Sequence, residues 1–176
     1  MSETTLKGLP LADFKIIHFA THGLLAGETS QLSKDHAEPA LVFSPPDTPT
    51  EEDDGLLTAS EIAALKLDAD WVVMSACNTA GGGEPGAEAL SGLAKAFFYA
   101  GARALLVSHW PVNSYAATML TSRIFAEMKR DPSIGRSEAL RRAMLALMSN
   151  EKRPWDAHPS VWAPFVVVGE GGAAAP

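Results

Sequence analysis

Four short apolar runs constrain the fold of this chain more than any other feature of its sequence. They are "FKIIHFA" at 14–20, "DWVVMSA" at 70–76, "RALLVSHW" at 103–110 and "APFVVVGE" at 163–170. Continuously apolar strands of this length are typical of a sheet that is covered on both faces. Amphipathic helices are predicted between them, at 87–100, 114–129 and 137–149. The pattern therefore predicts an α/β fold, with a mostly parallel central sheet flanked by helices.

The remaining segments add smaller elements. A short strand is predicted at 39–45, and Thr58 with Glu61 forms a capping-box pattern for a short helix. The polar stretch at 21–38 is expected to be a long loop, and the acidic, proline-rich stretch at 45–55 an exposed and mobile connection. Gly101 follows the predicted helix at 87–100, where a C-terminal glycine is favoured.

Length and composition predict one soluble domain. The chain has 176 residues, of which 47% are hydrophobic and 20% charged, as is usual for a globular protein with its own core. We expect a single domain over 1–176, with its core at about 9–169 and tails at 1–8 and 170–176. The strand at 14–20 is expected to be buried, with His18 in the core or in a second layer of side chains.

Charge and composition exclude several classes of protein. The net charge of −7 repels phosphate backbones, so we expect no nucleic-acid partner. No run approaches the roughly 18 apolar residues that a membrane span needs, and the N-terminus lacks the apolar stretch of a signal peptide. The chain contains one cysteine and therefore no internal disulfide, which favours a reducing, cytoplasmic location.

That cysteine, Cys77, comes directly after one apolar run, and His22 follows another by two residues. In parallel sheets, reactive groups gather at the carboxyl ends of the strands, so imidazole and thiol can face each other there. A base beside a thiol favours the nucleophilic thiolate. The main-chain N–H groups of Gly23 and Cys77 could then stabilise a developing oxyanion. A buried, inert thiol is the competing interpretation.

Other chemistries fit the residues less well. "GGGEPG" at 81–86 matches a dinucleotide-binding pattern, but "CNTA" separates it from the strand, and Glu84 and Glu88 would repel phosphates. One cysteine and scattered histidines show no metal-ligand spacing. No G-x-S-x-G motif is present, which argues against a serine hydrolase. We therefore expect neither a metal nor a cofactor.

Four segments in order carry a resemblance to a known family. "HFATHG", "MSACNTAGG", "GLAKAFFYAGARALLVSHWPV" and "WAPFVVVGE" are similar to the CHAT domains, which are caspase-like peptidase domains often fused to tetratricopeptide repeats. The likeness covers about residues 9–169. It implies a three-layer caspase–haemoglobinase-like sandwich and a catalytic dyad of His22 and Cys77. It also implies an oxyanion hole formed by the main chains of Gly23 and Cys77.

The chain departs from the family pattern in three places. Asn78 stands where an acid is common, and "SHWPVNS" replaces a "SLWPVDD"-like stretch. The family's N-terminal strands are also expected to be lacking, which would leave an exposed sheet edge that invites pairing with another chain. The resemblance implies a substrate groove lined by Ser75, Asn78, Ser108, His109 and Trp110.

The resemblance implies a cysteine endopeptidase that hydrolyses a protein or peptide substrate, regulated by a partner or by a tetratricopeptide-repeat domain. A basic substrate residue beside the scissile bond is one hypothesis, since Glu84 and Glu88 could reach the pocket. However, Ser75 occupies a position that is sometimes acidic in relatives with that preference. A catalytically silent interaction module with the same fold is the alternative function.

Overall fold

In the described part of the chain the central sheet has four strands, and each of them lies within one of the four predicted apolar runs. The computed structural model describes residues 1–32, 37–50, 52–75, 92–110 and 112–173. The strands are β1 (Ile16–Phe19), β5 (Trp71–Met74), β6 (Ala104–Ser108) and β7 (Phe165–Gly169), in the order β1-β5-β6-β7. β1, β5 and β6 are parallel, and β7 runs antiparallel to β6. The predicted mostly parallel sheet is confirmed.

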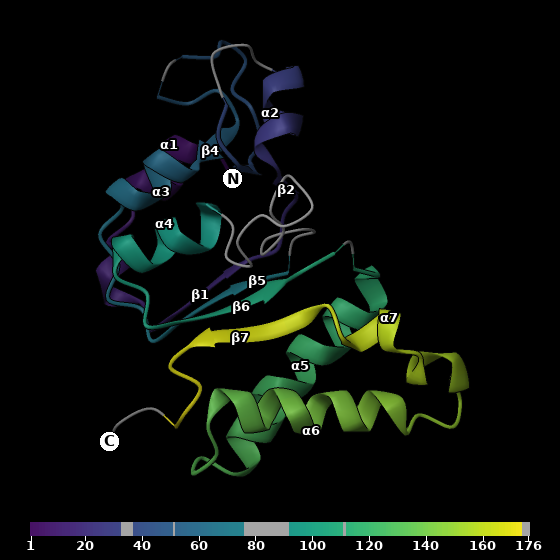
Figure 1. The fold of residues 1–176 in the computed structure, drawn as a ribbon. Helices are drawn as coiled ribbons and strands as arrows, with labels where there is room; N and C mark the ends of the chain where they lie inside the picture. Colours follow the sequence, from purple (N-terminus) through teal and green to yellow (C-terminus); the bar gives the residue numbers. More distant parts are fainter. Residues whose placement is uncertain (33–36, 51, 76–91, 111, 174–176) are drawn as a thin grey trace.

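Helices cover both faces of this sheet (Figure 1). On one face, α3 (Ala59–Ala64) and α4 (Gly92–Ala100) pack over Val72 and Met74 of β5. On the other face, α5 (Ser114–Arg130) and α6 (Arg136–Met148) pack over Trp71 and Val73. Alternate residues of a strand point to opposite faces, so all four side chains of β5 are buried. The domain is an α/β sandwich of three layers. Residues 87–91 of the predicted helix at 87–100 lie outside the described residues.

A second, smaller sheet lies beside the central one (Figure 1). It contains β2 (Gly23–Leu24), β3 (Ala40–Val42) and β4 (Leu56–Thr58), paired antiparallel in that order. The segment at 21–38 was predicted to be a loop, and that prediction is wrong for its first half. It contains β2 and the helix α2 (Ala26–Leu32). The strand pairing with β3 joins segments distant in sequence, which local polarity does not reveal.

The two ends of the chain also pack against the domain. Residues 1–8, expected as a tail, contain α1 (Glu3–Lys7), in which Glu3 and Leu6 are buried. A short 3₁₀ helix, η1 (Leu11–Asp13), follows. At the other end, Arg136 Nη1 donates to the carbonyl of Glu170 at 2.9 Å. Both described segments therefore have contact partners that lie far from them in the sequence.

β1 is an edge strand in the described part of the chain, since it pairs with β5 alone. The prediction of a fully buried strand at 14–20 is wrong for this reason. Only Phe19 of β1 is buried, while Ile16 is 46% exposed and His18 lies at the surface. The expected placement of His18 in the core is therefore also wrong.

Local signals at the helix ends are confirmed. Thr58 and Glu61 form the predicted capping box of α3, with reciprocal side-chain and main-chain bonds. Gly101 follows α4 with a φ of 112°, a conformation that glycine adopts without strain. After α6 the chain passes through η2 (Pro154–Ala157) and α7 (Pro159–Trp162) into β7. Among the described residues, no helix combines the length and apolar character needed to cross a membrane.

Candidate functional site

The register between β1 and β5 brings their carboxyl ends to one edge of the sheet. Phe19 is opposite Met74, so the residues that follow each strand leave the sheet side by side. The Ser75 N–H donates to the carbonyl of Phe19 at 3.1 Å, which continues the pairing one residue beyond β5. His22 follows β1 by a short turn, and its carbonyl accepts from the Val42 N–H at 2.8 Å. Sheet pairing therefore holds the main chain at both positions.

His22 and Ser75 lie on the wall of the same cavity, which has a volume of about 280 Å³. The end of β1, the end of β5 and the beginning of α5 form its described lining: Ala20, Thr21, His22, Ser75, Val112, Ser114, Ala117 and Thr118. Two of the predicted site residues are thus brought together by the fold. The cavity occupies the carboxyl edge of parallel strands, where α/β proteins bind their ligands.

A second histidine, His18, contacts this site through Ser75. His18 Nε2 lies 2.9 Å from Ser75 Oγ, within hydrogen-bonding distance. Residues 16 and 18 of β1 are opposite 71 and 73 of β5, so His18 and Ser75 share one face of the sheet. Partial burial lowers the pKa of His18 and so favours its neutral form. Sequence analysis identified His18 only as a packing residue, because the bond to Ser75 depends on register.

The wall formed by α5 was also missed. Asn113 caps this helix, since its Oδ1 accepts from the N–H groups of Tyr115 at 2.9 Å and Ala116 at 3.4 Å. Asn113 was identified from the sequence only as a departure from the family pattern. The stretch between β6 and α5 leaves the same edge of the sheet as His22. That short connection was the available signal that the start of α5 would reach the site.

The other predicted site residues lie in different surroundings. Gly23 is in β2, opposite Leu41 of β3. Ser108 is fully buried at the end of β6, opposite Phe165. His109 and Trp110 follow it at the surface, and Trp110 Nε1 lies 3.4 Å from the carbonyl of Ser160. None of these four residues lines the cavity that His22 and Ser75 share.

Cys77 and Asn78 lie outside the described residues, as do Glu84 and Glu88. The distance between the thiol and the His22 imidazole, on which the predicted dyad depends, therefore stays a prediction. Within the ranges that the structure describes, no group of three histidine, cysteine, aspartate or glutamate side chains is arranged to hold a metal ion.

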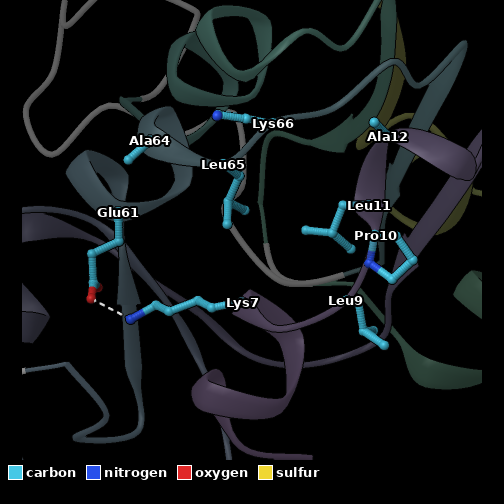
Figure 2. A pocket seen from close by; sticks show the side chains of 9 residues that line it. All are labelled: Lys7, Leu9, Pro10, Leu11, Ala12, Glu61, Ala64, Leu65 and Lys66. Carbon is cyan, nitrogen blue, oxygen red and sulfur yellow. Dashed lines mark hydrogen bonds and ion pairs between the residues drawn. The ribbon is translucent and has the colours of Figure 1, made fainter.

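A larger cavity of about 590 Å³ lies between α1, η1 and α3 (Figure 2). Its lining includes Leu9, Leu11 and Leu65, and an ion pair of 2.6 Å between Lys7 and Glu61 closes one side. Figure 2 shows the ion pair on one side of this space and Leu9, Pro10 and Leu11 on the other, with Leu65 between them. The described lining of this cavity contains no residue of the predicted site. Its charged side chains are Lys7 and Glu61, which pair with each other, and Lys66.

Comparison with known proteins now adds to this geometry. The CHAT domain family matches residues 1–170 of the chain. Tetratricopeptide repeat protein 28 of Mus musculus is 33% identical over 114 residues, and the protein of the same name from Homo sapiens is 32% identical over 114 residues. Each match covers 65% of this chain but 4% of the relative's own length. The family match and the three-layer fold lead to one conclusion: the chain belongs to the CHAT domain family, whose members are caspase-like.

Proposed function

We propose that this domain is a cysteine endopeptidase in which His22 and Cys77 form the catalytic dyad. The observation that carries the proposal is the shared cavity of His22 and Ser75 at the carboxyl edge of β1 and β5. Cys77 follows Ser75 by two residues in the sequence. In this proposal the Cys77 thiol meets the His22 imidazole at the cavity, which is the pairing that nucleophilic catalysis by a thiol requires.

The proposed reaction follows the chemistry of a thiol and an imidazole. His22 takes the proton of the Cys77 thiol, and the thiolate attacks the carbonyl carbon of a peptide bond. The main-chain N–H groups of Gly23 and Cys77 stabilise the oxyanion that forms. His22 then gives the proton to the leaving amine as the C–N bond breaks. Water, deprotonated by His22, hydrolyses the thioester and regenerates the thiol.

The substrate in this proposal is a protein or peptide, held in part by Asn78, His109 and Trp110, whereas Ser108 is fully buried and does not contact it. Regulation by a tetratricopeptide-repeat partner is part of the proposal, because the names of two relatives contain that repeat. A cytoplasmic location is also proposed, since the single thiol must stay reduced to act as a nucleophile.

The rate of Cys77 alkylation by iodoacetamide tests the dyad directly. In the wild type at pH 7, we expect a rate about tenfold above that of the same chain unfolded in urea, because an imidazole partner raises the thiolate fraction. His22→Ala should remove this excess while leaving the thermal unfolding midpoint nearly unchanged, as His22 is exposed. A slow wild-type rate that does not respond to His22→Ala would exclude the dyad.

A catalytically silent interaction module is the second candidate, and the free edge of β1 favours it. Phe14 and Ile16 are both 46% exposed there. They line a cavity of about 430 Å³ that runs along the strand. An edge strand with exposed apolar side chains is a surface on which another chain can add a strand. This candidate predicts an inert thiol, so the alkylation experiment separates the two functions.

A further inference from the structure

The cavity beside His22 has the size of a side-chain pocket. Its volume of about 280 Å³ lies just below the range of about 300–1,000 Å³ that is usual for small-molecule and cofactor sites. Two of its residues, Ala20 and Thr21, also line the longer cavity along β1. The two cavities therefore adjoin, as a peptide with one side chain in the smaller of them would require.

The described walls of this cavity combine four hydroxyls and the His22 imidazole with three apolar side chains, and they carry no carboxylate, lysine or arginine. Two of the hydroxyls are occupied within the protein: Thr21 Oγ1 donates to the carbonyl of Val42, and Thr118 Oγ1 donates to that of Ser114 at 2.8 Å. Ser75 differs from them, because its Oγ bonds to an imidazole at 2.9 Å and makes only a long contact of 3.5 Å with a main-chain carbonyl, that of Phe19. A hydroxyl has one donor and two acceptor sites, so Ser75 keeps bonding capacity beyond its contact with His18.

The hydrogen bond with His18 decides whether the Ser75 hydroxyl can donate a hydrogen bond to a ligand or accept one from it. If neutral His18 accepts at Nε2, the Ser75 proton is held by the imidazole and the oxygen can accept a bond from a ligand. If His18 carries its proton on Nε2, Ser75 can accept a second bond from a ligand, or donate to it in place of its 3.5 Å contact with the Phe19 carbonyl. In both tautomers the pair is uncharged and offers a hydrogen bond. His18 thus acts on a bound group through Ser75, as a positioning residue.

Charge on a bound side chain would not be compensated by these walls. A guanidinium or ammonium group would lose its water without meeting a counter-ion among the described lining residues, and burial of an unpaired charge is costly. A carboxylate would meet the same difficulty, because His18 favours its neutral form and the positive charge that His22 gains in the proposed reaction is already balanced by the Cys77 thiolate. An amide or hydroxyl loses less on burial and can bond to Ser75.

We propose that this cavity binds an uncharged, hydrogen-bonding side chain, such as that of Gln, Asn, Ser or Thr, and that the His18–Ser75 pair selects it. The inference deepens the proposed function and rests on it, because the side chain belongs to the peptide substrate. It differs from the hypothesis of a basic substrate residue, which depended on Glu84 and Glu88.

Binding and cleavage are measured separately to test this. A positional-scanning library of short peptides is bound to the full chain carrying Cys77→Ala, and enrichment is measured at each peptide position. We expect one position at which uncharged polar residues exceed Arg, Lys, Asp and Glu about five- to tenfold, the effect of one hydrogen bond. Ser75→Ala and His18→Phe should each abolish this preference, and the two together should have no further effect.

Two matched variants complete the design. His18→Gln, which keeps a bond to Ser75, should retain most of the selectivity, whereas a purely steric role for His18 would not distinguish Gln from Phe in this way. Ser30→Ala removes a hydroxyl on α2, which bonds within its own helix, and should leave selectivity unchanged. Enrichment of charged residues, absence of any selective position, or selectivity that survives Ser75→Ala would overturn the inference. Selective binding without cleavage by the wild type would instead leave the pocket intact and remove the peptidase.

Discussion

The Glu3 carboxylate accepts a hydrogen bond of 2.6 Å from the main-chain N–H of Gly55, and this bond ties α1 to the acidic connection before β4. The same carboxylate accepts from the Asp54 N–H at 3.1 Å and from Lys7 Nζ at 3.1 Å. Glu3 is fully buried. The stretch at 45–55 was predicted to be exposed and mobile, but Asp53 and Gly55 within it are buried.

Replacing Glu3 should therefore destabilise the domain. Glu3→Ala leaves two main-chain N–H groups without their buried acceptor, whereas Lys7 keeps its ion pair with Glu61, and this predicts a loss of about 3 kcal/mol in the free energy of unfolding. Glu3→Gln should lose less, because its amide oxygen can still accept. Urea denaturation measures both. Glu151→Ala, at an exposed glutamate, should change stability by less than about 0.5 kcal/mol. Equal effects of the Glu3 and Glu151 variants would contradict the burial argument.

Gly101 should tolerate no side chain. Its φ is 112°, and a Cβ at this position would lie 2.3 Å from the main-chain oxygen of Leu67. Because both the conformation and the contact oppose a side chain, Gly101→Ala should cost more than about 2 kcal/mol. Gly27→Ala is the control, since a Cβ added to Gly27 in α2 would have no atom within 4 Å apart from the helix's own local backbone. It should stabilise the domain by up to about 1 kcal/mol through helix propensity. Thermal unfolding of both variants makes the comparison.

The capping box of α3 should contribute a measurable part of the stability. The Thr58 N–H donates to Glu61 Oε2 at 2.9 Å, and Thr58 Oγ1 accepts from the Glu61 N–H at 3.4 Å. Thr58→Ala removes the second bond and should cost about 1 kcal/mol. Thr118→Ala, which deletes the same side chain inside α5, should be neutral or slightly stabilising. If denaturant midpoints show both variants equally destabilised, the cap is not the cause.

His18 should give the stability of the domain a specific dependence on pH. Partial burial lowers its pKa in the folded state below the ordinary value of about 6.5. The unfolded chain therefore binds a proton more readily, and the contribution is present above pH 6.5 and lost as pH falls through the folded pKa. The difference in unfolding free energy between wild type and His18→Gln should shift in favour of the variant from pH 7.5 to pH 5. A constant difference across that range would show that His18 titrates normally.

Sequence predicted the parts of the fold that depend on neighbours along the chain. The apolar runs of β5 and β6, the cap at Thr58 and the glycine at 101 were all identified correctly. Each rests on a local pattern, because a capping side chain bonds within three residues and a buried strand needs only continuous apolar character. The exposure of β1 was not predicted, since an edge strand and a central strand can have the same composition.

The candidate site was likewise predicted from the sequence only in part. His22 was predicted from its place at a strand end and Ser75 from the family resemblance, and the fold gathers them in one cavity. The contribution of α5 to that cavity and the bond between His18 and Ser75 were not predicted. Both depend on which strand lies beside which and on the register between them.

The sequence by itself determined the α/β class, the order of the main elements and the two strand ends that carry polar residues. Only the tertiary structure decided that His18 reaches Ser75, that α1 is held by the segment ending at Gly55, and that β1 lies at an edge. The physical reason is the separation along the sequence of the residues that interact. Strand and helix signals arise from side chains a few residues apart, whereas these contacts join segments more distant in the chain, whose alignment is set by the packing of the whole core.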